Sequence, residues 1–369
     1  MTLSVSLRHA LPGFALDATF EAPPGLTVLF GRSGSGKTTV INAVAGLIRP
    51  QSGRIVADGR VLFDSENRTC LPPHRRRLGY IFQEGRLFPH LTVQQNLTYG
   101  RWFAPRSAPR EDLARVVDLL GIGHLLTRRP AQLSGGEKAR VAIGRALLAA
   151  PAMILADEPL AALDEPRKAE ILPYFERLRD EVSVPILYVS HSAAEVARLA
   201  TTVIVLENGK VTHQGTAATV LGDPAISPTG VREVGAVLEA RVVTHHADGL
   251  TELVAGGLPL LLPRIARAPG DTVRVRIAAH DVILARQRPE GLTAQNVIEG
   301  TIAAIRPGTG PGMIVSVDTA AGRILARVTR RGATATGLAE GSDCWVVIKA
   351  VAIAPEDISG PAPAGGRTG

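Results

Sequence analysis

Residues 31–38 read Gly-Arg-Ser-Gly-Ser-Gly-Lys-Thr, and this octapeptide constrains the fold of the chain more than any other stretch. An apolar segment, residues 26–30, runs directly into it, and a helical pattern follows it up to Gly46. A strand, a glycine-rich loop and a helix in that order form a phosphate-binding loop. We therefore expect an α/β domain in which this loop follows a buried strand.

The residue types of the loop predict how it would hold a nucleotide. Glycines let backbone N–H groups surround the phosphates, the Lys37 ammonium neutralises their oxygens, and the Thr38 hydroxyl coordinates Mg²⁺. A second stretch, the apolar residues 153–156, ends in Asp157 and Glu158. Asp157 is expected to hold Mg²⁺, and Glu158 to polarise the attacking water. The predicted nucleotide-binding residues of the loop are Gly31, Arg32, Ser33, Gly34, Ser35, Gly36, Lys37, Thr38 and Thr39.

A second candidate anion site lies about a hundred residues later, at Ser134, Gly135 and Gly136. Ser134 and Glu137 also fit a capping box, so this stretch is expected to begin a helix whether or not it binds an anion. Because Lys37 already has its own phosphate loop, the second site must face a nucleotide held elsewhere. Two copies related by a two-fold axis would each close the other's site, which predicts a homodimer.

The pattern of strands and helices predicts two kinds of domain. Continuous apolar strands alternate with helices up to about residue 210, which is typical of a mainly parallel, covered sheet. We assign residues 1–230 to this α/β domain, with a helical insertion at about 84–150 and a Gly/Pro-rich connector within 212–235.

Beyond the connector the chain has an all-β character and an internal repeat. The hexapeptide starting at Val237 resembles the one starting at Val297, an offset of 297 − 237 = 60 residues. This offset predicts two packed copies of one small β unit, over 231–291 and 292–355. We expect an OB-like fold for each copy and a disordered tail at 356–369, which is rich in Pro and Gly.

Composition excludes some functions. The net charge is +7, but aromatic residues make up only 4% of the chain and do not alternate with basic segments, which argues against nucleic-acid binding. The densest basic run, residues 74–77, is expected to be a solvated face or a partner contact. The longest apolar stretch is too short to cross a bilayer. Two cysteines, Cys70 and Cys344, have no metal-ligand spacing.

Four motifs in order, "GRSGSGKT", "LSGGE", "ILADE" and "SH", resemble the ATPase subunits of ABC transporters over residues 1 to about 215. The resemblance implies ATP hydrolysis and three further roles. Gln83 would contact Mg²⁺ and the water, His191 would sense the γ-phosphate, and Asp164 would touch the opposite monomer. Phe14 is the nearby candidate for stacking on adenine.

The same resemblance implies partners. Residues 84–100 lie where such ATPases receive a helix from a membrane subunit, and we expect an exposed apolar groove there at Leu87, Phe88 and Leu91. The implied assembly is a homodimer on two membrane-spanning permease subunits, fed by a periplasmic or extracellular binding protein. The chain would then lie peripherally on the cytoplasmic face of the cell membrane.

Two stretches of the α/β domain, "GRVLFDSE" and "AIGRALLAAPAMILADEPLAALDE", are similar to the ATPases of molybdate importers. The second β unit resembles molbindin-like domains, which implies an oxyanion site at Thr293, Asn296 and Lys349, although Gln295 replaces the expected arginine. Two alternatives remain open at this point. One is an importer of another anion such as sulfate, and the other is a soluble ABC ATPase acting on nucleic acid or ribosomes.

Overall fold

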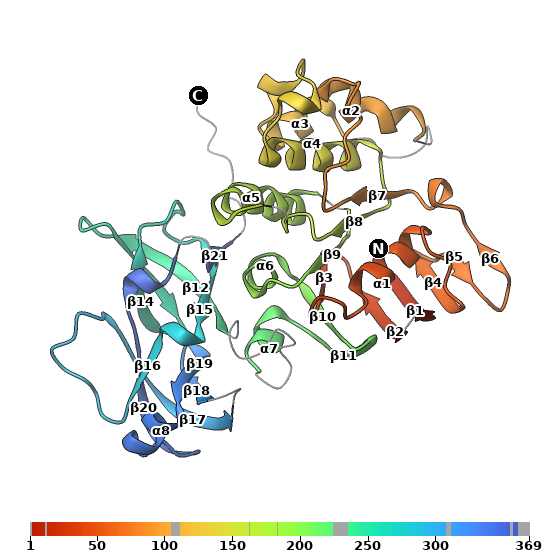
Figure 1. Ribbon diagram of the computed structural model, residues 1–369. Helices are drawn as coiled ribbons and strands as arrows, with labels where there is room; N and C mark the ends of the chain where they lie inside the picture. Colours follow the sequence, from red (N-terminus) through yellow and green to blue (C-terminus); the bar gives the residue numbers. More distant parts are fainter. Residues whose placement is uncertain are drawn as a thin grey trace. The chain divides into compact units, whose positions relative to one another are not determined.

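The computed structural model describes residues 2–11, 13–104, 111–161, 163–182, 184–223, 235–307, 311–354 and 357–360. The chain divides into two compact units (Figure 1). Unit 1 comprises Met1–His191 and Thr201–Gln214, and unit 2 comprises Ser192–Ala200 and Gly215–Gly369. The first unit therefore ends earlier than the domain boundary predicted at residue 230. The reason is that the helix at 217–221 packs on the strand at 235–245, the first of the β region.

Within the described residues, unit 1 contains an 11-stranded sheet in the order β6-β5-β4-β1-β2-β11-β10-β3-β9-β8-β7. Its strands are β1 (Leu3–Leu11), β2 (Phe14–Ala22), β3 (Leu26–Phe30), β4 (Ser52–Ala57), β5 (Arg60–Asp64), β6 (Thr69–Cys70), β7 (Leu78–Ile81), β8 (Met153–Asp157), β9 (Ile186–Ser190), β10 (Thr202–Glu207) and β11 (Lys210–Gly215). Its α-helices are α1 (Lys37–Ala45), α2 (Val93–Tyr99), α3 (Leu113–Leu119), α4 (Gly135–Leu148) and α5 (Glu165–Glu181).

The sheet of unit 1 is mixed, whereas the sequence predicted a mainly parallel one. Strands β10, β3, β9, β8 and β7 run parallel, and all but the edge strand β7 consist mainly of buried residues. Strands β1, β2, β4, β5 and β6 pair antiparallel, because short connections such as the one at 58–59 return the chain beside itself. The predicted α/β class and the predominantly helical stretch between β7 and β8 are confirmed.

The parallel part of the sheet determines where the site forms. Strand β9 lies between β3 and β8, with Phe30 opposite Ser190 and Asp157 opposite Val189. The three strands therefore end at the same edge of the sheet. Residues that follow these strands, Gly31, Glu158 and His191, are brought together there although they are far apart in sequence.

Unit 2 contains α6 (Ala193–Leu199), α7 (Ala217–Leu221) and, among its described residues, two five-stranded sheets. One sheet has the order β14-β13-β12-β15-β21 and the other β16-β20-β17-β18-β19. The elements are β12 (Gly235–His245), β13 (Leu250–Ala255), β14 (Leu258–Pro263), β15 (Thr272–Ala278), β16 (Val282–Ala285), β17 (Asn296–Pro307), β18 (Gly312–Thr319), β19 (Gly322–Thr329), α8 (Arg330–Thr336), β20 (Asp343–Ile348) and β21 (Ile358–Ser359).

The internal repeat appears in the strand pairing itself. The register of β12 shifts between Val242 and Thr244, and that of β17 shifts between Ile302 and Ala304. These bulges lie 302 − 242 = 60 and 304 − 244 = 60 residues apart, the same offset as the sequence repeat. The all-β character of the C-terminal region is confirmed.

The two copies exchange their last strands. β16 lies at the end of the first copy but pairs with β20 of the second, and β21 follows the second copy but pairs with β15 of the first. The expectation of a disordered tail from 356 is therefore wrong for Ile358–Ser359, because these residues complete the first sheet. Residues 356 and 361–369 of that tail, and 224–234 of the connector, lie outside the described residues.

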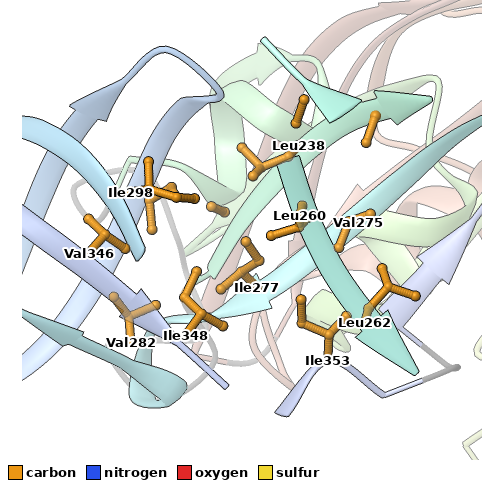
Figure 2. Packing of buried hydrophobic residues seen from close by; sticks show 14 of the residues in the cluster. Leu238, Leu260, Leu262, Val275, Ile277, Val282, Ile298, Val346, Ile348 and Ile353 are labelled. Atoms are coloured by element: carbon orange, nitrogen blue, oxygen red, sulfur yellow. The ribbon is translucent and has the colours of Figure 1, made fainter. Parts of the chain in front are cut away.

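One hydrophobic core lies between the two sheets of unit 2. Figure 2 shows Leu238, Leu260 and Ile277 of the first sheet facing the same interior as Ile298 and Val346 of the second. Burial of this shared core, together with the strand exchange, makes the two copies one folded unit rather than two linked modules. Across the described part of the chain, no helix combines the length and apolarity needed to span a bilayer.

Candidate functional site

The glycines of the octapeptide are required by the shape of the loop between β3 and α1. Gly34 and Gly36 have φ values of 81° and 103°, a region that favours glycine. A Cβ on Gly31 would overlap the carbonyl oxygen of Leu206. The loop thereby delivers Lys37 and Thr38 to the first turn of α1, where free N–H groups favour anions.

Lys37 lies at the centre of the site, with only 4% of its surface exposed. Its ammonium donates hydrogen bonds to the carbonyl oxygens of Gly31 at 2.8 Å and Arg32 at 2.9 Å, and lies 3.8 Å from Glu158 Oε1. Burial lowers the pKa of Lys37, while the nearby carboxylates of Glu158 and Asp157 act in the opposite direction. A triphosphate would add the negative charge that a buried ammonium needs.

Asp157, the last residue of β8, faces Thr38 across the site. The Thr38 hydroxyl donates to Asp157 Oδ1 at 3.2 Å. Burial raises the pKa of Asp157, and hydrogen bonds from Thr38 and Tyr80 oppose the shift. A hydroxyl and a partly desolvated carboxylate side by side are the hard oxygen ligands that Mg²⁺ prefers, so these residues fit the predicted metal.

Glu158 and His191 stand next to one another at the ends of β8 and β9. Glu158 Oε1 lies 3.4 Å from His191 Nδ1. Glu158 has a φ of 43°, a left-handed conformation that costs about 1 kcal/mol or more for a residue with a side chain. Its backbone N–H donates to Val189 O at 3.2 Å, which helps to hold this conformation. In this conformation the same carboxylate oxygen, Oε1, lies near both Lys37 and His191.

Lys37, Thr38, Asp157 and Glu158 share one cavity of about 570 Å³, whereas His191 is not among its described lining residues. Phe14 also lines it, and its ring lies against Gly36, where an added Cβ would approach it to 3.0 Å. This places the predicted adenine-stacking ring at the nucleotide cavity. The lining residues are Phe14, Ser33, Gly34, Gly36, Lys37, Thr38, Thr39, Gln83, Asp157 and Glu158.

Ser134 and the two following glycines are placed elsewhere. Ser134 is the N-cap of α4, where its hydroxyl accepts from Glu137 N at 3.2 Å and Glu137 Oε2 accepts from Ser134 N at 2.7 Å. This backbone hydrogen bond is the main reason that the pKa of Glu137 is lowered. Gly135 lines a second cavity of about 330 Å³, to which Leu163 also contributes and which shares Gln83 with the Lys37 cavity. Within the described chain, residues 134–136 do not line the Lys37 cavity.

Asp164 begins α5 as its N-cap. Its carboxylate accepts from Arg167 N at 3.2 Å and lies 3.8 Å from the Arg167 guanidinium. With this cap, Asp164 serves a local structural purpose beside the role implied by the resemblance.

The expectation of a solvated basic run at 74–77 is wrong for Arg76, whereas His74 and Arg75 are exposed. Arg76, within the basic run at 74–77, is 2% exposed and donates to the carbonyl oxygens of Ala43, Val44 and Leu71 rather than facing solvent. Phe88 is partly buried against Tyr99, with ring centroids 4.4 Å apart, and Leu87 and Leu91 are also half-buried. The exposed aromatic side chains nearby are those of Tyr99, Trp102 and Phe103. The apolar groove expected at Leu87, Phe88 and Leu91 stays a prediction.

Sequence reasoning missed Asn42 and Tyr80 at the site. The Tyr80 hydroxyl lies 2.9 Å from Asn42 Oδ1 and 3.3 Å from Asp157 Oδ2. Burial, and then the adjacent Asp157, raise the pKa of Tyr80, so the phenol stays protonated. The signal available in the sequence was the alternating pattern of residues 78–81, which predicts a strand directly before Gln83. In the structure this strand, β7, lies next to β8.

The candidate oxyanion residues lie near the ends of β17 and β20, where Asn296 is opposite Ile348. Thr293 and Lys349 are exposed. Asn296 is 2% exposed, and its amide is bonded to one backbone unit: it accepts from Leu261 N at 2.7 Å and donates to Leu261 O at 2.8 Å. Asn296 therefore joins the two sheets.

Comparisons with known proteins agree with this geometry. The profile of the ABC transporter family matches residues 17–161, and that of the TOBE domain matches residues 292–355. A solved structure of cbiO1 from Clostridium perfringens, part of an ABC transporter complex, has a TM-score of 0.51 and 26% identity, covering 60% of this chain and 90% of that one. The fold and the site define an ATP-binding cassette of the ABC transporter class.

Two curated relatives narrow the family further. The molybdenum import ATP-binding protein ModC of Mesorhizobium japonicum is 52% identical over 95% of this chain and 95% of its own length. The protein of the same name from Rhizobium meliloti is 52% identical over 96% of this chain and 99% of its own. The chain belongs to the ModC family of molybdenum import ATP-binding proteins.

Proposed function

We propose that this chain is the ATP-hydrolysing subunit that drives molybdate import through an ABC transporter. The observation that carries the proposal is the convergence of Lys37, Asp157 and Glu158 where three adjacent parallel strands end. The cargo is proposed from the similarity to the ModC relatives, because this similarity extends over both units and includes the C-terminal β region. That extent favours molybdate over an alternative anion and over a soluble ATPase of nucleic acid or ribosomes.

The residues of the cavity suggest how hydrolysis proceeds. The loop N–H groups and Lys37 hold the phosphates of ATP, and Phe14 contacts the base. Glu158 accepts hydrogen bonds from the attacking water and takes its proton, with His191 beside it near the γ-phosphate. Thr38, Asp157 and Gln83 would hold Mg²⁺, which supplies neutralising charge to the phosphate oxygens when bound.

The partner of this site is a second copy of the chain. Ser134, Gly135 and Gly136 begin a 14-residue helix whose first N–H groups have no partners within the helix. Because they lie outside the Lys37 cavity of their own chain, they suit a nucleotide held by the other copy. Asp164 would stand at the same interface. ATP then holds the dimer closed, and hydrolysis at Glu158 reopens it.

The membrane partners are proposed from the segment that follows Gln83. Trp102 is 87% exposed and Phe103 is 74% exposed, directly after α2 and close to Tyr99. We assign this region to contact with the permease subunits, which in turn receive molybdate from a binding protein. The chain would work peripherally at the cytoplasmic face of the membrane.

The C-terminal domain is proposed to sense an oxyanion and to reduce transport when the oxyanion accumulates. Lys349 and the Thr293 hydroxyl provide the exposed cation and donor. Asn296 keeps the ends of β17 and β20 in place beside β14. Titration calorimetry with molybdate on the full chain, compared with Lys349→Ala, tests this role, which equal heats in both proteins would contradict.

The main proposal is tested by Glu158→Gln. We expect this variant to lose ATP hydrolysis by a factor of about 10² to 10⁴, because it lacks the general base, while ATP still binds. Light scattering should then show an ATP-dependent dimer. In reconstituted vesicles, ATP-driven uptake should accept molybdate in preference to sulfate. Equal competition by sulfate would assign another cargo to the same machinery.

A further inference from the structure

Tyr80 lies between α1, the helix that follows the phosphate-binding loop, and β8, the strand that ends in Asp157. It belongs to neither of the two nucleotide-binding motifs. It sits on β7, opposite Leu155 of β8, two residues before Asp157. Its hydroxyl reaches Asp157 Oδ2 at 3.3 Å and Asn42 Oδ1, on α1, at 2.9 Å. A single phenol thus connects the element that carries Lys37 to the strand that ends in Asp157.

The two oxygens of Asp157 receive different donors. Thr38 donates to Oδ1, and Tyr80 donates to Oδ2. Because a carboxylate with both oxygens engaged has one preferred rotation, the phenol holds the Oδ1 edge toward Thr38. This is the edge that would meet the metal beside the nucleotide phosphates.

Asn42 determines how strongly the phenol donates to Asp157. A hydroxyl has one proton, and here two oxygens lie within its reach. The oxygen and nitrogen of an amide occupy nearly equivalent positions, so Asn42 can also present its Nδ2 to the phenol. In that orientation Asn42 donates to Tyr80 Oη, and the phenolic proton goes to Asp157 alone.

The ring of Tyr80 extends the connection to the segment of Gln83. It stacks on Phe82 with centroids 4.1 Å apart and 25° between the planes. The Arg86 guanidinium covers the Phe82 ring at 4.5 Å. Gln83 follows Phe82 directly and lines the same cavity as Asp157. A shift of this segment therefore moves the phenol that orients the Asp157 carboxylate.

We propose that Tyr80 is a positioning residue, which orients Asp157 for Mg²⁺–ATP through its hydroxyl and ties that orientation to the Gln83 segment through its ring. The proposal rests on the proposed function, because it needs a metal–nucleotide site at Asp157. It adds a residue whose effect is on the metal-dependent part of nucleotide binding.

The test is Tyr80→Phe, which keeps the stacked ring and removes the hydroxyl. Binding of a fluorescent ATP analogue is measured on the full chain over a range of Mg²⁺ concentrations and again in EDTA. We expect the Mg²⁺ concentration for half-maximal effect to rise about three- to tenfold, the loss of one hydrogen bond of ordinary strength, because the contact is 3.3 Å long and Asn42 lies within reach of the same proton. Affinity in EDTA and the melting temperature should stay close to those of the wild type.

Tyr99→Phe is the matched control, because it makes the same chemical change at a half-exposed ring of the helical part. Asn42→Ala removes the second oxygen within reach of the phenol, and should add little to the effect of Tyr80→Phe since both act through one hydroxyl. Additive effects, an unchanged Mg²⁺ requirement, or an equal loss of affinity in EDTA would each overturn the positioning role. A wild-type chain whose ATP affinity ignores Mg²⁺ would instead count against the proposed function.

Discussion

Replacing Arg76 by leucine should destabilise unit 1 strongly, although the residue lies in a run of four basic residues. The guanidinium donates to the carbonyl oxygens of Ala43 at 2.7 Å, Val44 at 2.8 Å and Leu71 at 2.8 Å. Ala43 and Val44 belong to the last turn of α1, whose carbonyl groups lack partners within the helix. Arg76 therefore caps the C-terminal end of α1, the helix that begins at Lys37.

The size of the effect follows from these three contacts. Each hydrogen bond to a charged group contributes about 1.5–3 kcal/mol, so the three together give a gross value of about 4.5–9 kcal/mol. Burial, which also lowers the pKa of Arg76, offsets part of this because the charge has been desolvated. We expect a net loss of about 3–5 kcal/mol, because leucine leaves these carbonyl oxygens without the guanidinium donor and each unsatisfied buried acceptor costs about 1–3 kcal/mol.

Chemical denaturation of the full chain, followed by circular dichroism, measures this loss. Arg75→Leu is the matched control, because Arg75 is exposed in the same run and its replacement should change stability by about 0.5 kcal/mol or less. Arg76→Lys should be intermediate, since an ammonium cannot reach all three carbonyls in the planar geometry of a guanidinium. A loss below 1 kcal/mol for Arg76→Leu would refute the capping argument.

Two other substitutions test the site and the C-terminal unit. Gly31→Ala should abolish tight ATP binding, because the added methyl group displaces the loop from Leu206 O; wild-type affinity by equilibrium dialysis would show that the loop tolerates it. Asn296→Leu should lower the stability of unit 2 by about 1–3 kcal/mol, since it leaves the N–H and C=O of Leu261 without their amide partner. A full chain that melts at the wild-type temperature would contradict that joint role.

The sequence predicted the parts of the site that are contiguous along the chain. The phosphate loop and the Asp157–Glu158 pair are local patterns at strand ends, and the parallel sheet brings such ends together. Arg76 and Tyr80 were not predicted to matter at the site, because their partners lie 33 and 77 residues away and depend on tertiary packing. In the sequence, a basic run looks the same whether its side chains face solvent or cap a helix. An alternating strand likewise does not show which partners its side chains will meet.

The C-terminal region shows the same limit in its topology. The 60-residue repeat was visible in the sequence and is repeated in the bulges of β12 and β17. The exchange of β16 and β21 was not, since a two-residue strand such as Ile358–Ser359 has no periodicity to read. This strand, β21, forms by pairing with the edge of β15, and no local sequence pattern shows that this edge is available.

The central claim is that each ATP is enclosed by Lys37 of one copy and the Ser134–Gly136 turn of the other. Mixed dimers of Lys37→Ala with Ser134→Arg, both in the Glu158→Gln background and purified through two different tags, test it directly. Such a dimer has one site with both defects and one intact site, so we expect one retained ATP per mixed dimer and none in either variant alone. Mixed dimers that retain no ATP would contradict the claim, because each copy would then need both elements on its own chain.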